Sequence, residues 1–270
     1  MALVTQRREK SAAIITFANP PRGYMNAAQV AELAKLIEEI ELDASVRTVI
    51  FTGGVPGVFV RHYDVGDILE AAGAVRKSGL DGAALMEAGK RGNPISQLFD
   101  KIDGLNIPTI AAINGYCQGG GFEFALCCDI RIAEEGDYRI GLPETNIGIF
   151  PGAGGTQRLP RVIGEAKALE LILKGETLPP QEAAEAGLVH EFVPMGGALS
   201  RALEIAENFA AKTPRALAEA KQLVKGAARG PLPEGCAEER GRFSRLLLED
   251  DEALRLMQDF QNGTQEINKA

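Results

Sequence analysis

The sequence predicts an α/β fold followed by a helical region at its C-terminal end. Over the first 150 residues, short runs rich in β-branched side chains alternate with segments of helical periodicity, which indicates successive β-α-β crossovers. From Thr156 onward the pattern becomes almost entirely helical. The chain has 270 residues, of which 45% are hydrophobic and 24% charged, so it is long and apolar enough to bury a large core.

Two strands and one helix make the first predicted crossover. Residues 12–17 and 48–52 are rich in β-branched side chains and end at Asn-Pro-Pro and at Gly-Gly, which terminate strands. Between them, five apolar residues recur at helical spacing, with charged residues on the opposite side. The apolar residues are Val30, Leu33, Leu36, Ile37 and Ile40.

A second unit repeats this order. Asn93 is a suitable N-cap for a helix that begins at Pro94 and runs to about residue 103. Residues 108–113 are then predicted to form a buried strand, residues 121–128 a helix and residues 130–133 the next strand.

Further helices are predicted toward the C-terminus. One begins at the Pro179-Pro180 pair and ends at Gly187, because proline suits the first turn of a helix and glycine its end. Three more are predicted over residues 200–212, 215–228 and 238–261.

We therefore expect a core over residues 1–195 and a helical region over residues 196–270. The Ala- and Gly-rich segment 71–92 is expected to be a mobile insert, and residues 263–270 a frayed tail.

Composition and charge argue against several classes of function. The net charge is −8 and no run of Lys or Arg forms a basic stripe, which disfavours nucleic acid or an anionic membrane as a partner. No stretch approaches the ~18 apolar residues of a membrane span, and the first ten residues are polar, so a cytosolic protein is expected. The cysteines lack CxxC spacing and the histidines lie far apart, so no zinc site or disulfide framework is predicted. These residues are Cys117, Cys127, Cys128, Cys236, His62 and His190.

Three consecutive glycines, residues 119–121, stand between a predicted strand and a predicted helix. Glycines at such a turn let the free N–H groups of the first helical turn point at a ligand. Together with the helix dipole, these groups suit a developing negative charge. The spacing matches neither the dinucleotide-binding motif nor the P-loop.

Two carboxylates are candidates for proton transfer. Glu123 lies in the first turn of the helix after the glycines, where a carboxylate also serves as an ordinary partner of the helix dipole. Glu144 follows a probable strand and a proline. Carboxylates on turns after neighbouring strands can flank one small volume, one moving a proton while the other positions a water. The glycine-rich turn at residues 151–155 leads into another helix and can be read as a simple loop.

Three segments in the same order resemble the enoyl-CoA hydratase/isomerase, or crotonase, family. They are AAINGYCQGGGFEFALCCDIRIA, GLPETNIGIFPGAGGTQRLPRVIG and EAAEAGLVHEFVP. The resemblance runs from about residue 10 to about residue 195 and more loosely through the helical tail. It implies a spiral of β-β-α units with a helical C-terminal region, assembled as a trimer or a dimer of trimers.

The resemblance also implies a substrate and a mechanism. Family members bind an acyl-CoA thioester and need no further cofactor. The carbonyl oxygen of the thioester sits in an oxyanion hole of two backbone N–H groups, one of which falls on Gly120. Hydratases of the family use two glutamates about a water, and these fall on Glu123 and Glu144.

The second oxyanion donor falls on Tyr63 by position. The family pattern there is F-[SA]-[SA]-G-[AG]-D, whereas this chain has FVRHYD over residues 59–64. The Phe and the Asp are kept, but bulkier residues replace small ones, and a missing glycine is expected to affect the backbone angles. Two roles are open for His62. Its side chain can act as a general acid or base, or it can simply cover the CoA or the surface.

Contacts to coenzyme A are expected in two segments. In the resemblance, Arg22 lies in the segment that grips the adenosine end, and Tyr24 and Met25 match positions whose main chain contacts CoA. Arg61, within the altered loop, and Val65 are further expected contacts of CoA. Either Arg can pair with phosphate or remain solvated. An apolar stripe in the tail is expected to pack in the core or on a neighbouring subunit. It consists of Phe243, Leu246, Leu247 and Leu256.

The sequence thus predicts a 2-enoyl-CoA hydratase. Two alternatives stay open. One keeps the thioester site but catalyses isomerisation, or hydration followed by cleavage of an aryl-enoyl-CoA. The other is a non-catalytic CoA-binding or assembly protein in which the altered loop at residues 60–63 has closed the site.

Overall fold

Two β-sheets organise the computed structural model, which describes residues 2–227 and 230–266. The larger sheet has the order β1-β2-β3-β5-β7-β10, in which β1 is antiparallel to β2 and the other neighbours are parallel. Its strands are β1 (Val4–Glu9), β2 (Ala12–Phe17), β3 (Thr48–Gly53), β5 (Thr109–Ile113), β7 (Ile130–Glu134) and β10 (Glu191–Val193). The smaller sheet has the order β4-β6-β8-β9. Its strands are β4 (Val58–Val60), β6 (Tyr116–Gln118), β8 (Ile140–Gly141) and β9 (Thr177–Leu178).

The chain winds between the two sheets as a spiral. The successive pairs β3-β4, β5-β6 and β7-β8 each place their first strand in the larger sheet and their second in the smaller one. Each pair is followed by helical structure: α2 (Val65–Ser78), α5 (Gly120–Cys127), and η1 (Glu144–Ile147) with α6 (Gly155–Ile163). The predicted spiral of β-β-α units is therefore confirmed.

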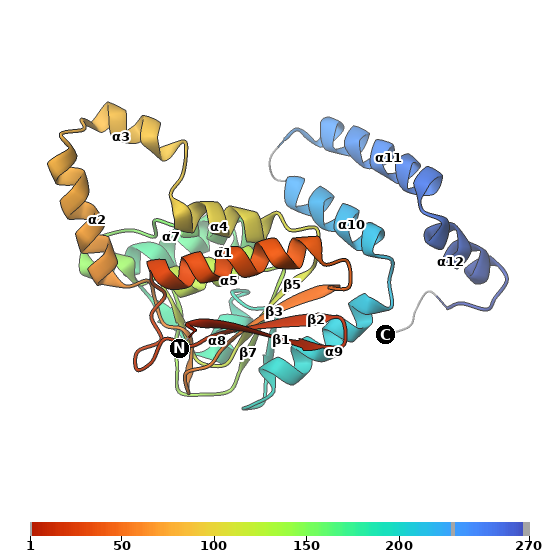
Figure 1. Cartoon of the computed structure of the whole chain (residues 1–270), viewed down its shortest axis with the longest axis horizontal. Coiled ribbons are helices and arrows are strands. Elements are labelled where there is room, and N and C mark those ends of the chain that lie inside the picture. Colours follow the sequence, from red (N-terminus) through yellow and green to blue (C-terminus); the bar gives the residue numbers. More distant parts are fainter. Residues whose placement is uncertain (1, 228–229, 267–270) are drawn as a thin grey trace.

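Helices cover both faces of the larger sheet (Figure 1). On one side lie α1 (Ala27–Leu42) and α4 (Pro94–Asp103), and on the other lies α9 (Ala198–Ala210). The start of α4 matches its sequence prediction, because the Asn93 side chain accepts the Ser96 N–H and Pro94 occupies the first turn. Local capping chemistry is thus sufficient to set this boundary.

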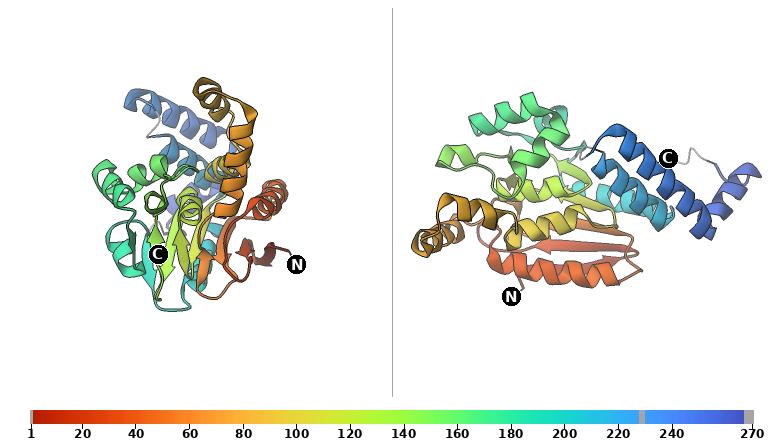
Figure 2. Two further views of the ribbon diagram at one scale, coloured as in Figure 1. Left: turned by 90° about the vertical axis from the view of Figure 1, so that its left-hand side faces the viewer. Right: turned by 90° about the horizontal axis from the view of Figure 1, so that it is seen from above.

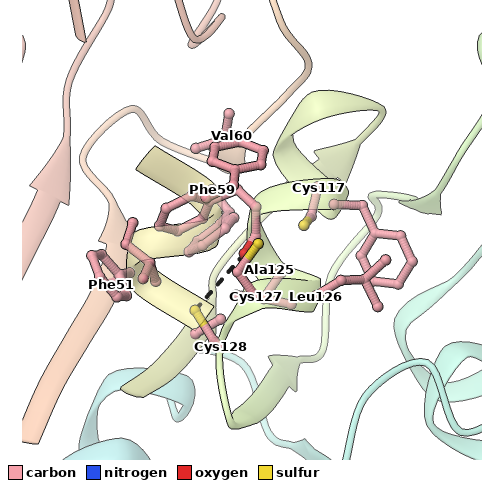
Figure 3. Close-up of a cluster of buried hydrophobic side chains, with 14 of the residues drawn as sticks. Phe51, Phe59, Val60, Cys117, Ala125, Leu126, Cys127 and Cys128 are labelled. Atoms are coloured by element: carbon pink, nitrogen blue, oxygen red, sulfur yellow. Dashed lines mark hydrogen bonds between the residues drawn. The ribbon is translucent and has the colours of Figure 1, made fainter. Parts of the chain in front are cut away.

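The main core gathers around Phe124 on α5. The rings of Phe17, Phe51, Phe59 and Phe99 lie 4.9–6.3 Å from the Phe124 ring, mostly edge to face. Figure 3 shows part of this cluster, with Cys127 and Cys128 at the end of α5. These cysteines and Cys117 are buried free thiols. The helix that carries Glu123 is therefore surrounded by packed apolar side chains.

A second cluster joins α9 to the opposite face of the sheet. Ala198, Ala202 and Ala206 of α9 are buried together with Ile14, Ile50, Ile110 and Ile132 of the sheet. The expected boundary near residue 195 falls between β10 and α9, but α9 belongs to the core. The helices that stand clear of the sheets are α10 (Pro214–Gly226), α11 (Leu232–Glu249) and α12 (Asp251–Gln261), at the end of the molecule opposite α2 and α3 (Gly82–Gly89) (Figures 1 and 2).

Several sequence predictions need correction. The part from Thr156 onward is almost entirely helical, as predicted, but the short strands β9 and β10 also lie within it beside α7 (Glu165–Lys174) and α8 (Pro180–Glu185). The single helix predicted over residues 238–261 is two helices, with Asp250 between them accepting the Ala253 N–H as the N-cap of the second.

The insert predicted at residues 71–92 contains most of α2 and all of α3, while its mobility stays a prediction. Residues 228 and 267–270 of the predicted last helices and tail lie outside the described residues.

Candidate active site

Two loops meet where neighbouring strands of the smaller sheet end. Tyr63 follows β4 and Gly120 follows β6, and these two strands are parallel neighbours. A Cβ atom added to Gly120 would lie 2.9 Å from Tyr63 Cβ and 3.2 Å from Tyr63 N, and one added to Gly121 would lie 1.9 Å from Val60 O. The backbones approach so closely that these two positions require glycine.

The N–H groups of Tyr63 and Gly120 are both available as donors. Within residues 2–227 and 230–266, neither group donates to a protein acceptor. Gly120 is also the first residue of α5, so its N–H lies at the positive end of the helix dipole. The pair can therefore receive one oxygen that carries partial negative charge.

The altered loop at residues 60–63 is held in an ordinary conformation. Lys10 is the one non-glycine residue with positive φ in the described chain, so His62 and Tyr63 lie outside the left-handed region. His62 O accepts the Met25 N–H at 2.8 Å, and the Asp64 N–H donates to Met25 O at 2.7 Å. These bonds hold the loop without a left-handed residue, and the expected effect of the missing glycine on the backbone angles stays a prediction.

Glu123 is buried and held by backbone donors. Its side chain is in the first turn of α5, and the residue is 3% exposed. Its Oε1 accepts the N–H groups of Ala153 and Gly155, each at 2.8 Å. Burial raises the pKa of Glu123, whereas these two hydrogen bonds and the charge of Arg158 act in the opposite direction. One carboxylate oxygen is thus fixed, and the group is oriented.

Glu144 has a different environment. It begins η1, and its Oε2 is buried without a hydrogen-bond partner among the described residues. Burial, and secondarily the charge of Glu123, raise the pKa of Glu144 to about 7. A Cβ atom on Gly119 would lie 3.3 Å from Glu144 Oε1, so the carboxylate sits directly against the glycine turn. Near neutral pH this group can either hold or release a proton.

Both carboxylates line one cavity of about 1560 Å³. Its wall also includes Gly120, Tyr63 and His62. Apolar side chains of α1, α2 and α4 and of the segment 147–153 form most of the remaining wall. The structure therefore brings Glu123, Glu144, Gly120 and Tyr63 together on one cavity. The turns after neighbouring strands allowed such a meeting of the two carboxylates, and the resemblance placed Gly120 and Tyr63 at the same site.

The residues predicted to contact coenzyme A are more dispersed. Val65 lies on the cavity wall, whereas Met25 is fully buried and pairs with Tyr63. The Tyr24 ring stacks on His62, with the Arg22 guanidinium 5.7 Å from its centroid. The Arg61 guanidinium lies 4.5 Å from the centroid of the Tyr116 ring. The side chains of Arg22, Tyr24 and Arg61 are thus placed outside the cavity wall, and their contact with coenzyme A stays a prediction.

Sequence reasoning missed the support of Glu123. Arg158 on α6 donates to Ala153 O at 3.1 Å and to Asp100 Oδ1 at 2.6 Å. It thereby holds the turn whose N–H groups bind Glu123. The sequence signal for this support was a glycine-rich turn followed by an arginine in the first turn of the next helix. A turn of this kind is too common in sequences to single out without its contacts.

Comparison with known proteins agrees with this geometry. The model of the enoyl-CoA hydratase/isomerase family matches residues 7–262. The chain is 35% identical over 245 residues to the 2,3-dehydroadipyl-CoA hydratase of Escherichia coli (strain K12), and the match covers 90% of each chain. It is 39% identical over 218 residues to a probable enoyl-CoA hydratase of Bacillus subtilis (strain 168), with 78% of each chain covered. The crystal structure of an enoyl-CoA hydratase from Bacillus anthracis has a TM-score of 0.83 and 32% identity, covering 97% of this chain and 96% of that one. The chain therefore belongs to the enoyl-CoA hydratase/isomerase family.

Proposed function

We propose that the protein is a 2-enoyl-CoA hydratase, which adds water across the double bond next to a thioester. The observation that carries this proposal is the pairing of two features in one cavity. Glu123 and Glu144 line it together, and the free N–H groups of Tyr63 and Gly120 lie beside them. Members of this family act on acyl-CoA thioesters, which supplies the carbonyl that such donors suit.

The two backbone donors supply electrostatic stabilisation. When water attacks C3 of the enoyl group, negative charge develops on the thioester oxygen. The Tyr63 and Gly120 N–H groups receive that oxygen, and each donor stabilises the transition state by about 3 kcal/mol in comparable sites. Because the donors are already in place, the loop need not reorganise during the reaction.

The two carboxylates divide the handling of the water. Glu123 Oε1 is occupied by two N–H groups, which leaves Oε2 to accept a hydrogen from the water and orient it. Glu144, with a pKa of about 7, gives a proton to C2. The water oxygen bonds to C3, and the proton that the water loses returns to the carboxylate pair. The pair therefore ends each turnover in its starting state.

An assay with a panel of short, long and aryl 2-enoyl-CoAs tests this function. We expect loss of the conjugated enoyl absorbance and formation of a 3-hydroxyacyl-CoA. A product with a shifted double bond would favour isomerisation, and release of an aldehyde with acetyl-CoA would favour hydration followed by cleavage. No turnover together with no binding of any CoA ester would favour the non-catalytic alternative.

We also propose that the protein assembles as a trimer or a dimer of trimers in the cytoplasm. Large apolar residues are exposed on α11 and α12, including Phe243, Leu248 and Phe260, and a neighbouring subunit would cover them. None of the described helices is long and apolar enough to cross a bilayer. Sedimentation equilibrium of the full chain tests the assembly, and a monomer at micromolar concentration would contradict it.

A further inference from the structure

His62 occupies the position at which the family pattern has glycine, and it is one of the residues that line the cavity. Its Nδ1 is 2.7 Å from Tyr63 O. A carbonyl oxygen only accepts hydrogen bonds, so Nδ1 carries the hydrogen and donates it. The ring also stacks on Tyr24, with centroids 4.0 Å apart and an interplanar angle of 29°. Two independent contacts therefore hold the imidazole.

The bond from Nδ1 closes a ring of atoms that contains the His62–Tyr63 peptide. That ring runs from the imidazole through the His62 backbone to Tyr63 O, so rotation about ψ of His62 and φ and ψ of Tyr63 is coupled to the side chain. The same peptide is held from the other side, because His62 O accepts the Met25 N–H at 2.8 Å. The N–H of this peptide is the Tyr63 group proposed to bind the thioester oxygen. Its direction is thus set by His62 and Met25 together.

We propose that His62 is a positioning residue of the oxyanion hole, whose Nδ1–H holds the Tyr63 N–H in the direction of the thioester oxygen. This inference rests on the proposed function, because that function assigns the Tyr63 N–H to the thioester. In this inference the Nε2 atom of His62 transfers no proton. The His62 side chain restricts rotation in the loop at residues 60–63, which small residues would leave freer to rotate.

The competing interpretation is that Nε2 of His62 transfers a proton, because His62 lies close to the reacting groups. A Cβ atom on Gly119 would lie 3.4 Å from His62 Cβ and 3.3 Å from Glu144 Oε1, so His62 and the reacting groups are close neighbours. The two readings use different ring nitrogens. Asparagine places an amide donor near the position of Nδ1, whereas glutamine places its amide near the position of Nε2.

The experiment compares His62→Asn, His62→Gln and His62→Ala with the wild-type protein. Steady-state kinetics give kcat and KM, and infrared spectroscopy gives the carbonyl stretch of bound hexanoyl-CoA labelled with ¹³C at the carbonyl. This saturated ester cannot be hydrated, so the spectrum reports the oxyanion hole without turnover. His190→Asn is the matched control, since the other histidine lies outside the cavity wall and accepts the Arg131 N–H at 3.1 Å. Thermal unfolding of each variant verifies that it is folded.

We expect His62→Asn to keep kcat within about threefold of wild type, and His62→Ala and His62→Gln to lower kcat about tenfold or more, with KM changed little. In the wild-type protein the carbonyl band should shift to lower frequency on binding. His62→Ala and His62→Gln should lose part of that shift, while His190→Asn should keep it.

Activity in His62→Gln with loss in His62→Asn would overturn the inference in favour of proton transfer by Nε2. Wild-type behaviour of all three variants would overturn it in favour of a ring that only covers the site. A wild-type protein that hydrates no enoyl-CoA but shows a band shift that depends on His62 would refute the hydratase and keep the positioning role. No band shift in the wild-type protein would refute the positioning role itself.

Discussion

At the scale of single residues, the two carboxylates of one cavity differ in what surrounds them. Glu123 is held by the N–H groups of Ala153 and Gly155, whereas Glu144 Oε2 has no hydrogen-bond partner among the described residues. Buried polar atoms are normally satisfied, so an unpartnered carboxylate oxygen is costly for folding. Its presence beside the free N–H groups of Tyr63 and Gly120 supports the proposal that this group is kept for chemistry at the expense of stability.

Glu144→Gln should therefore stabilise the protein, and more so at high pH. The pKa of Glu144 is about 7 in the folded protein, compared with an ordinary value of 4.5. Between these values the folded state binds more protons than the unfolded state, so the free energy of unfolding falls as pH rises through this window. Above pH 7 the free energy of unfolding is lowered by the full amount, up to about 3 kcal/mol. Thermal unfolding at pH 5 and pH 8 should show a larger rise in Tm for the variant at pH 8. An equal shift at both values would contradict the assigned pKa.

The same carboxylates should be essential for turnover. Glu123→Gln and Glu144→Gln should each lower kcat by about two orders of magnitude or more, because each removes a group that we propose to act on the water or on C2. Binding of a saturated acyl-CoA should weaken only modestly, which equilibrium titration would show. Full hydratase activity in Glu123→Gln would mean that this residue has a structural role, and it would favour isomerisation.

At the scale of elements, the turn before α6 orients Glu123 through its backbone. Arg158 secures that turn by binding Ala153 O, and its guanidinium is in turn paired with Asp100 on α4. Gly154 has a φ of 108°, a value that glycine adopts at little cost, and this bends the chain so that the N–H groups on either side face the carboxylate. The glycine-rich turn is thus a binding site for a protein carboxylate.

Arg158→Gln should lower kcat about tenfold or more, with a smaller change in KM, because the turn would no longer hold Glu123 in one orientation. Arg161→Gln is the matched control. Arg161 lies on the same helix, and its Nη1 donates to Gln157 O at 3.1 Å on the exposed surface. Steady-state kinetics give kcat and KM for the two variants. Equal activity in both would show that Arg158 has no positioning role.

At the scale of the whole molecule, ion pairs dock α10, the first of the projecting C-terminal helices, onto the core. Lys221 and Lys225 on α10 both pair with Asp129, at 2.8 and 2.9 Å, and Lys225 also pairs with Asp103 at 2.6 Å. Lys225 further donates to Cys127 O at the end of α5. The helix that begins the projecting region is therefore anchored at the far end of the helix that carries Glu123.

Lys225→Met should destabilise the protein by about 3 kcal/mol, because it leaves the largely buried Asp103 and Asp129 with less compensating charge. Lys90→Met is the control, since Lys90 forms an exposed pair with Glu87 and should cost under about 1 kcal/mol. Chemical denaturation gives both values. A loss below 1 kcal/mol for Lys225→Met would show that the ion pairs of Lys225 contribute little to the docking of α10, and that Lys221 and the remaining contacts hold this helix.

The sequence by itself determined the elements whose signals are local. The Asn93 cap with Pro94 predicted α4, and the β-branched run of residues 12–17 predicted β2 with its observed bounds. By contrast, β1 was missed because only Val4 of its six residues is buried, so it carries no clear alternating pattern. The short strands β4, β6, β9 and β10 were missed because pairing with distant strands, more than their own propensity, makes them strands.

The same division applies to the site. The glycine triplet and the identities of Glu123 and Glu144 were readable from the chain, and their turns after neighbouring strands allowed the two carboxylates to meet without requiring it. Only the tertiary structure decided the raised pKa of Glu144, the two donors to Glu123 and the support from Arg158. Burial and hydrogen-bond partners depend on residues far away in the chain. Local sequence specifies the groups available for chemistry, whereas their protonation and direction come from what packs around them.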